Sequence, residues 1–270
     1  MVLPKVPAQR TEPRGTRQAA EVIATQPPAS ADRNATVSPV ASGASGSRVI
    51  WSPLSAATMC SSSVSPLAAG LAAVRADAPV AYVSSTDVPL LHPRFVRRVL
   101  AAVDDGVDVA LPQVRGYPQP LAAAYRTALV DVVERLIAED RMRPAFLFEA
   151  CRVRRLDEAA LLGDPALAAL DPALDSVLNL NERTDYEAAR ARPAPEVTVQ
   201  RFGALRRLGN GARDPGVVQA ATLGEAAAAS GLTLDEHIVA ALNGDQITRD
   251  PQAPLAAGDT VAFMAADAGG

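Results

Sequence analysis

The chain has 270 residues, of which 49% are hydrophobic and 4% aromatic, so it can form one large globular domain or two small ones. Its formal net charge of −4 indicates no basic surface for nucleic acid, and its two cysteines exclude a disulfide scaffold and a four-cysteine zinc site. No apolar run is long enough to span a membrane, and the first residues lack the apolar core of a signal peptide, so we expect a cytoplasmic protein without nucleic-acid or membrane partners.

Residues 1–64 differ in composition from the rest of the chain. Ser, Ala, Pro, Thr and Arg dominate, and neither helical nor strand periodicity persists. We expect a low-complexity segment that is disordered or lies outside the fold that follows. Translation of a GC-rich gene in a wrong frame would give a similar composition, and both interpretations stay open.

Residues 65–192 show the pattern of an α/β domain. The predicted helices cover residues 66–74, 93–104, 121–138 and 184–191, the last capped by Thr184. The predicted strands cover residues 79–85, 107–111, 153–156 and 176–178. Strands that alternate with helices predict a partial doubly wound, Rossmann-like, mainly parallel sheet.

A Pro-rich linker at residues 193–196 precedes residues 197–270, which are numerous enough to fold alone. The predicted strands cover residues 197–202, 238–242 and 260–264. Thr222 and Glu225 form a capping box that opens a helix ending at Gly231, and Asn243-Gly244 predicts a hairpin. This order predicts a small α+β domain of the β-grasp type.

Asp87 follows directly on the strand predicted at residues 79–85. Ligands of open α/β sheets bind at the carboxyl ends of the strands. A carboxylate there can hold Mg²⁺ together with substrate phosphates. The alternative is that Asp87 caps the helix that begins near Pro89 or Pro93.

Asn179 and Asn181 point to the same side if their segment is extended. Two neighbouring carboxamides can bind a polar heterocycle, or orient a phosphate and its metal. The alternative is a loop leading into a helix, with Asn181 or Thr184 as the cap.

Three further features are candidates for binding. The loop at residues 116–120, which ends in Pro120, either approaches a ligand closely or is a simple turn. Arg141 and Arg143 either face phosphates or lie on a solvated face. The terminal Gly269-Gly270 can thread a narrow adenylating site, or is a frayed end. Cys151 lies in an apolar stretch and is expected in the core.

The motifs of residues 66–191 resemble the later two-thirds of the molybdenum cofactor guanylyltransferase family, the MobA-like nucleotidyltransferases. The resemblance rests on the PLAAGLAAV segment, Thr86-Asp87-Val88-Pro89, Pro120-Leu121 with Tyr125, and Asn179-Leu180-Asn181 with Asp185-Tyr186. It implies that the family's Asp-x-Pro motif falls on Asp87 and its Asn-x-Asn motif on Asn179 and Asn181. The family also opens with a glycine-rich phosphate loop, which nothing in residues 1–64 matches.

Residues 196–270 resemble the ubiquitin-like sulfur carriers of the MoaD/ThiS type. The resemblance rests on Asn243-Gly244, Pro254-Leu255, the run 258–261 and the terminal Gly269-Gly270. It implies that Gly270 is adenylated and thiocarboxylated by activating and sulfur-transfer enzymes. It also implies the large subunit of molybdopterin synthase as a partner.

The two resemblances lead to two main hypotheses. The first is a nucleotidyltransferase that joins GMP, or CMP, from GTP or CTP to molybdopterin, impaired by the missing phosphate loop. Asp87 would be catalytic and hold Mg²⁺, and Asn179, Asn181, Pro120 and Arg143 would bind substrate. The second is a sulfur carrier for which residues 65–192 are a scaffold. A third alternative is a product with neither activity.

Overall fold

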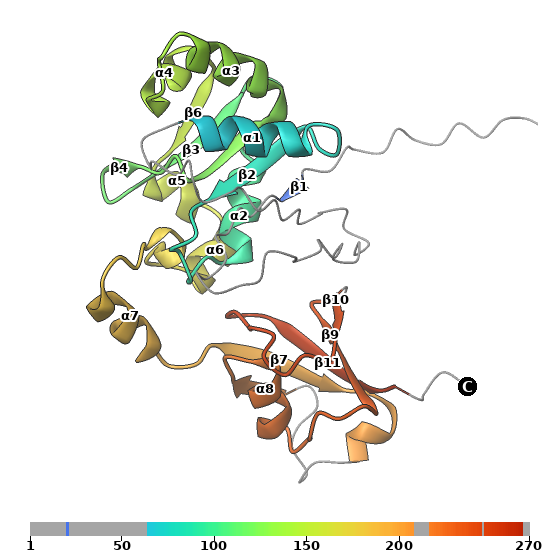
Figure 1. The fold of residues 1–270 in the computed structure, drawn as a ribbon. Coiled ribbons are helices and arrows are strands. Elements are labelled where there is room, and N and C mark those ends of the chain that lie inside the picture. Colours follow the sequence, from blue (N-terminus) through green and yellow to red (C-terminus); the bar gives the residue numbers. More distant parts are fainter. Residues whose placement is uncertain (1–19, 22–63, 208–215, 245, 267–270) are drawn as a thin grey trace, which may run out of the picture.

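The computed structural model describes residues 20–21, 64–207, 216–244 and 246–266. These ranges form two sheets, each with its own helices and hydrophobic core (Figure 1). The first sheet and its helices occupy the upper part of Figure 1 and the second sheet the lower part. Within the described ranges, every helix is too short or too polar to cross a bilayer.

The first sheet combines parallel and antiparallel strands. Its order is β1 (Ala20–Glu21), β2 (Val80–Ser84), β5 (Ala122–Arg126), β3 (Val109–Val114) and β4 (Tyr117–Pro118), and β6 (Val153–Leu156) also pairs with β3. β1 is parallel to β2 and β6 is parallel to β3, whereas β5 is antiparallel to both β2 and β3. The α/β class is confirmed, and the described sheet is mixed because the reversed strand β5 lies at its centre.

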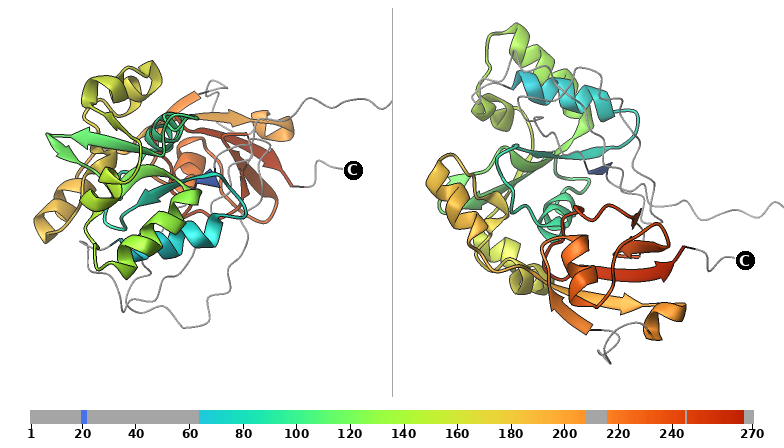
Figure 2. Two further views of the ribbon diagram at one scale, coloured as in Figure 1. Left: turned by 90° about the horizontal axis from the view of Figure 1, so that it is seen from above. Right: turned by 60° about the horizontal axis from the view of Figure 1, so that its bottom comes forward.

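Helices cover both faces of this sheet (Figures 1 and 2). One face packs against α1 (Ser65–Val74), α3 (Val130–Ala138) and α4 (Pro144–Glu149). The other packs against α2 (Pro93–Leu100), α5 (Glu158–Leu162) and α6 (Pro165–Leu170). The central strands are therefore buried along almost their whole length, as expected for a sheet covered on both sides.

The long helix predicted at residues 121–138 is wrong. Its first part is the strand β5, followed by a 3-10 turn η2 (Thr127–Leu129), and only α3 is an α-helix. Ala123, Ala124 and Tyr125 are almost completely buried at the centre of the sheet. Small side chains there let the helices of both layers approach closely, so packing overrides the helix propensity of alanine.

The strand predicted at residues 176–178 is also wrong, because this segment is the 3-10 turn η3 (Asp175–Val177). The carboxylate of Asp171 accepts hydrogen bonds from the backbone N–H groups of Asp175 and Ser176, at 2.7 and 3.1 Å. A side chain that bonds the backbone in this way favours a turn over a strand ladder.

The predicted helix at residues 184–191 is confirmed as α7 (Arg183–Arg190), but its cap differs. Glu182 is the N-cap, and Glu182 and Asp185 form a capping box. The expected cap, Thr184, lies inside the helix and is exposed.

The short strand β1 falls in the segment predicted to lack regular structure. Ala20 and Glu21 pair with Ala81 and Tyr82 of β2. The other residues before Val64 lie outside the described ranges.

The second sheet has its first and last strands side by side. Its elements are β7 (Glu196–Arg201), the 3-10 turn η4 (Gly203–Arg207), β8 (Gly216–Gln219), α8 (Leu223–Ala229), β9 (Ile238–Leu242), β10 (Gln246–Thr248) and β11 (Thr260–Ala265). The strand order is β10-β9-β11-β7-β8, with β11 parallel to β7 and every other pair antiparallel. Figure 2 shows α8 lying across one face of this sheet, where Leu223, Ala226 and Ala227 join the core.

The local signals of this second unit are confirmed. Thr222 caps α8 by accepting from the backbone N–H of Glu225, whose carboxylate reaches back to the N–H of Ala221. Asn243 and Gly244 join β9 to β10 with φ angles of 53° and 86°. Glycine adopts such an angle without strain.

Candidate functional site

The carboxyl ends of three strands of the first sheet meet at one edge. β5 is antiparallel to both β2 and β3, so β2 and β3 run in the same direction, and β6 runs with β3. The N–H of Ser85, just after β2, donates to the carbonyl of Leu121, just before β5, at 2.9 Å. The loop after β2 and the chain leaving the β3–β4 hairpin therefore lie side by side at the edge where α/β proteins bind ligands.

Asp87, in the loop after β2, is hydrogen-bonded to Asn179, which follows η3. The side chain of Asn179 donates from Nδ2 to Oδ2 of Asp87 at 2.8 Å, although 92 residues separate them. The backbone repeats the contact, because the N–H of Leu180 donates to the carbonyl of Asp87 at 2.9 Å. The two residues predicted from separate motifs are thus brought together.

The second carboxylate oxygen of Asp87 is a candidate cation ligand. Oδ1 is buried and has no hydrogen-bond partner in the described part of the chain. A buried carboxylate oxygen without a partner is costly unless something binds it. Mg²⁺ prefers oxygen ligands and is held by one or two carboxylates plus substrate phosphates. Among the described residues, no group of three or more His, Cys, Asp or Glu side chains could hold a metal ion.

Asn181 lies two residues beyond Asn179, at the start of α7. Its backbone N–H and that of Glu182 donate to Oδ2 of Asp185, at 3.2 and 3.1 Å. The side chain of Asn181 is exposed. The bond from the N–H of the preceding residue, Leu180, to the carbonyl of Asp87 places Asn181 next to the loop of Asp87, and the capping box fixes its backbone.

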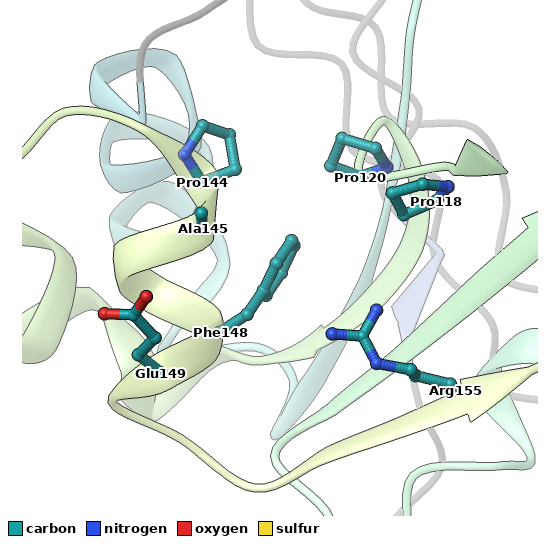
Figure 3. A pocket seen from close by; sticks show the side chains of 7 residues that line it. All are labelled: Pro118, Pro120, Pro144, Ala145, Phe148, Glu149 and Arg155. Atoms are coloured by element: carbon teal, nitrogen blue, oxygen red, sulfur yellow. The ribbon is translucent and has the colours of Figure 1, made fainter.

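A pocket of about 410 Å³ opens between the β3–β4 hairpin, α4 and β6 (Figure 3). It is lined by Pro118, Pro120, Pro144, Ala145, Phe148, Glu149 and Arg155. In Figure 3 the ring of Phe148 stands between the carboxylate of Glu149 on α4 and the guanidinium of Arg155 on β6. The pocket thus combines an apolar, partly aromatic wall with one positive and one negative group.

Pro120, predicted as a substrate contact, is one of the residues that line this pocket. Its carbonyl accepts a hydrogen bond from the hydroxyl of Tyr125 at 2.7 Å. Tyr125 is fully buried in β5, and burial raises the pKa of its hydroxyl, which stays a donor at neutral pH. The central strand therefore holds one wall of the pocket in place.

Arg143, the other predicted substrate contact, is exposed at the N-cap of α4, next to the pocket residue Pro144. Arg141 is engaged within the protein, because its guanidinium lies 4.5 Å from the ring centre of Phe146 and 3.6 Å from carboxylate oxygens of Glu139 and of the pocket residue Glu149. Arg143 is therefore the arginine of the two that remains exposed beside the pocket.

Phe148, Glu149 and Arg155 were not among the residues predicted from the sequence. Arg155 lies at the carboxyl end of β6, so the rule that singled out Asp87 would also have found it. Phe148 and Glu149 lie on a short helix whose apolar pattern resembles that of a core helix, and no local signal distinguishes them.

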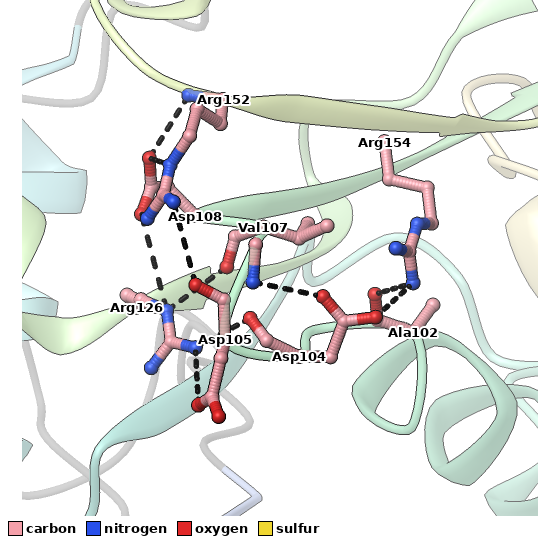
Figure 4. Close-up of polar contacts among 9 residues, drawn as sticks. Ala102, Asp104, Asp105, Val107, Asp108, Arg126, Arg152 and Arg154 are labelled. Atoms are coloured by element: carbon pink, nitrogen blue, oxygen red, sulfur yellow. Dashed lines mark hydrogen bonds and ion pairs between the residues drawn. The ribbon is translucent and has the colours of Figure 1, made fainter.

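Charged residues also gather at the opposite edge of the sheet (Figure 4). The ion pairs join Asp104, Asp105, Asp108, Arg126, Arg152 and Arg154. Arg152 donates to Asp108 at 2.8 Å, which lowers the pKa of that carboxyl and raises the pKa of the guanidinium. These charges are paired with one another, so the cluster connects the ends of neighbouring strands.

Two remaining predictions fall elsewhere. Cys151 packs against the core, and burial raises the pKa of its thiol to about 11, which agrees with a structural role. Gly269 and Gly270 lie outside the described residues.

Comparison with known families assigns the first part of the chain to a family. The model of the MobA-like NTP transferase domain matches residues 13–154, more than half of the chain. The chain belongs to the MobA-like NTP transferase family. The match begins inside the segment 1–64, for which no family resemblance was predicted from the sequence. It includes Asp87 and every residue that lines the pocket except Arg155, which directly follows its last residue.

One curated relative of this MobA-like domain matches over part of its length. It is 30% identical over 111 residues to the molybdenum cofactor guanylyltransferase of Desulfosudis oleivorans, covering 41% of this chain and 52% of that protein. The chain thus spans about half the length of this curated relative.

Two solved structures are also similar. The molybdopterin-guanine dinucleotide biosynthesis protein A of Archaeoglobus fulgidus matches with 24% identity and a TM-score of 0.39, over 53% of this chain and 66% of that one. A putative protein from Aquifex aeolicus matches with 21% identity and a TM-score of 0.32, over 43% of this chain and 56% of that one.

Proposed function

We propose that this chain is a nucleotidyltransferase that joins GMP, or CMP, to molybdopterin, using GTP or CTP. The observation that carries the proposal is the state of Asp87. One carboxylate oxygen is held by Asn179, and the other is buried and has no partner among the described residues, at the carboxyl ends of the strands of a MobA-like domain. The molybdopterin part of the proposal is supported by the 30% identical guanylyltransferase of Desulfosudis oleivorans.

The reaction is a substitution at phosphorus. A phosphate oxygen of molybdopterin forms a bond to the α-phosphorus of the nucleotide, while the bond from that phosphorus to the bridging oxygen breaks and pyrophosphate leaves. When bound, Mg²⁺ would neutralise charge that develops on the phosphates. Asp87 would hold it through Oδ1, and Asn179 binds the other oxygen, Oδ2, which orients the carboxylate.

In this proposal, the pocket of Figure 3 binds the acceptor, molybdopterin. A flat, partly polar heterocycle fits between the ring of Phe148 and the proline wall, because aromatic and apolar surfaces bind ring systems while a few polar groups orient them. Arg155 in the pocket wall, and Arg143 directly before the pocket residue Pro144, provide positive charge for a phosphate. Asn181 offers an exposed carboxamide at the same edge of the sheet.

The proposal includes a weak nucleotide site. No glycine-rich phosphate loop is recognisable in residues 1–64, and such a loop normally holds nucleotide phosphates through its backbone N–H groups. We therefore expect an impaired transferase, whose nucleotide affinity depends mainly on the metal.

Isothermal titration of the full chain with GTP and CTP, with and without Mg²⁺, tests the metal role. Asp87→Asn should lower the Mg²⁺-dependent affinity at least about tenfold, which corresponds to about 1.4 kcal/mol. Asp105→Asn is the matched control, because the carboxylate of Asp105 is fully exposed at the opposite edge of the sheet. Equal Mg²⁺-dependent affinities for the wild type and Asp87→Asn would overturn the proposal.

A second function is favoured by the strand order of the second sheet. We propose that residues 197–270 form a ubiquitin-like β-grasp domain that carries sulfur as a thiocarboxylate on Gly270. The order second-first-fifth-third-fourth, with the first and fifth strands parallel and a helix after the second, supports this topology. The partners would be an adenylating enzyme, a sulfur-transfer enzyme and the large subunit of molybdopterin synthase.

Mass spectrometry of the C-terminal peptide tests the carrier role. After co-expression with an adenylating enzyme and a sulfur donor, the peptide should gain the mass difference between sulfur and oxygen. Deletion of Gly269 and Gly270 should abolish the product and leave the circular dichroism spectrum unchanged. A wild-type peptide whose carboxylate is never exchanged would exclude the carrier role.

A further inference from the structure

The loop at residues 256–259, just before β11, connects the second unit to the first. The carbonyl of Ala257 lies 2.9 Å from Nε2 of His92, which is the residue before α2. Its neighbour Gly258 lies against the end of α6, since a Cβ atom there would be 2.7 Å from Cδ2 of Leu170. The loop thus contacts the start of α2 and the end of α6 together.

His92 uses both of its ring nitrogens. Nδ1 accepts a hydrogen bond from the backbone N–H of Arg94 at 3.0 Å, so the side chain caps α2. Because Nδ1 is an acceptor, the proton of the neutral ring is on Nε2, which donates to the carbonyl of Ala257. One side chain therefore caps the N-terminus of α2 and is hydrogen-bonded to the second unit.

The backbone of His92 extends this connection toward η3. Its N–H donates to Oγ of Ser176 at 3.1 Å, across 84 residues of sequence. Oγ of Ser176 in turn donates to Oδ2 of Asp171, the carboxylate that also holds the backbone of η3. Ser176 is buried, so this link is shielded from water.

The same two segments carry the candidate site. His92 ends the loop after β2 that contains Asp87, and Ser176 lies shortly before Asn179. The segments are therefore joined at one end by His92 and Ser176, and at the other by Asp87 and Asn179. A shift of the first contact would move the second, because only a few residues separate them in each segment.

We propose that His92 is a positioning residue through which the second unit sets the geometry of the Asp87–Asn179 pair. Docking of Ala257 on Nε2 holds the ring, the ring holds the start of α2, and the backbone of His92 aligns η3 and Asn179. The effect on nucleotide binding rests on the proposed function, whereas the effect on the geometry of the pair does not.

Two variants of His92 separate the cap from the bridge. Asn is a strong N-cap but too short to reach Ala257, so His92→Asn keeps the cap and loses the bond to the second unit. Gln places an amide nitrogen near the position of Nε2, so His92→Gln restores a donor to Ala257. If the bridge matters, Asn should be defective and Gln should recover most of the wild-type behaviour.

Two glycine variants test the same contact from the second unit. Gly258 has a φ of 79° and Gly244 a φ of 86°, so alanine is strained to a similar degree at both. Only at Gly258 would the added Cβ meet the first unit, because Gly244 has open space around it. Gly258→Ala should therefore disturb docking, and Gly244→Ala is its matched control.

Hydrogen exchange of the full chain, followed by mass spectrometry, measures the geometry of the pair. The amide of Leu180 is protected by its bond to the carbonyl of Asp87. We expect its exchange to be about fivefold faster in His92→Asn and Gly258→Ala, as for the loss of one ordinary hydrogen bond, and near the wild-type rate in the other two variants. Titration with GTP and Mg²⁺ should show a parallel loss of affinity in the same two variants.

The outcomes distinguish this proposal from the proposed function. Unchanged exchange at Leu180 in His92→Asn and Gly258→Ala would overturn the positioning role. Equally faster exchange in all four variants would also overturn it, because general destabilisation would then explain the effect. Faster exchange in the two expected variants of a chain that binds no nucleotide would support the coupling and count against the proposed function.

Discussion

Asn179 and Asp87 are joined by a hydrogen bond of 2.8 Å from Nδ2 to Oδ2, and this bond determines what each side chain can do. The carboxylate of Asp87 is fixed through one oxygen, which leaves Oδ1 buried and without a partner among the described residues. The carboxamide of Asn179 uses a donor for this purpose and therefore orients Asp87. Asn181, whose side chain is exposed, is the asparagine of the motif that is available to a substrate.

Substitution of the two asparagines should therefore have different effects. Asn179→Ala should weaken Mg²⁺-dependent nucleotide binding about tenfold, because Asp87 loses a hydrogen bond to a charged group worth about 1.5–3 kcal/mol. Asn181→Ala should leave that binding unchanged and raise the KM for the acceptor. Titration and steady-state kinetics on both variants check this division, which equal effects in both assays would contradict.

The sequence identified Asp87 and Asn179 individually, because each stands next to a local signal, a strand end or a paired-amide motif. Their hydrogen bond could not be predicted from local sequence patterns, because it depends on how the loop after β2 packs against the segment that follows η3. The segment 176–178 was predicted as a strand because of its apolar residues. It is a turn because the carboxylate of Asp171 bonds its backbone, which the sequence alone does not indicate. Phe148 and Glu149 could not be predicted for a similar reason. Their helix lines a pocket only because the β3–β4 hairpin packs opposite it, and this packing has no local sequence signal.

The ion pairs of Figure 4 predict a pH dependence of stability. The hydrogen bond from Arg152 lowers the pKa of Asp108 below its ordinary value of 3.8. A carboxyl group whose pKa is lowered by folding stabilises the protein above its unfolded pKa and loses this contribution as the pH falls through its folded pKa. Asp108→Asn should therefore be less stable than the wild type at pH 7, and the difference should shrink as the pH falls below 3.8.

Thermal unfolding at a series of pH values measures this difference. Asp105→Asn is the control, because the carboxylate of Asp105 is fully exposed and lies 3.8 Å from Arg126. Surface pairs of this kind contribute little, so its melting temperature should follow the wild type at every pH. A constant gap between the wild type and Asp108→Asn down to pH 2 would contradict the role of the carboxylate charge.

Cys151 should react slowly with alkylating reagents in the folded protein. Burial raises the pKa of its thiol to about 11, so at pH 8 only a small fraction is the reactive thiolate. Iodoacetamide labelling followed by peptide mapping should show little modification of Cys151 at pH 8 until urea is added. Rapid labelling of this residue without urea would show that the core around it opens readily.

The hydroxyl of Tyr125 should stabilise the hairpin wall of the pocket. Tyr125→Phe removes the donor to the carbonyl of Pro120 and keeps the buried ring. We expect a loss of about 0.5–1.5 kcal/mol in the free energy of unfolding, measured with urea. Tyr117→Phe is the control, since the side chain of Tyr117 is 72% exposed, and a loss of the same size there would argue against the buried bond.

The central strand β5 should tolerate no enlargement, because small side chains there allow helices to pack on both faces of the sheet. Ala124 is completely buried and faces the core that includes Phe95 of α2. Ala124→Leu should lower the free energy of unfolding by about 1–3 kcal/mol, since added methylene groups in a packed core force neighbouring side chains apart. The same substitution at Ala72, an exposed position of α1, adds a good helix former and should be nearly neutral. Urea unfolding of the two variants compares a buried strand position with an exposed helix position. If Ala124→Leu were neutral as well, residues 122–126 would not occupy the packed centre of the sheet, and the assignment of this segment to a strand would have to be abandoned.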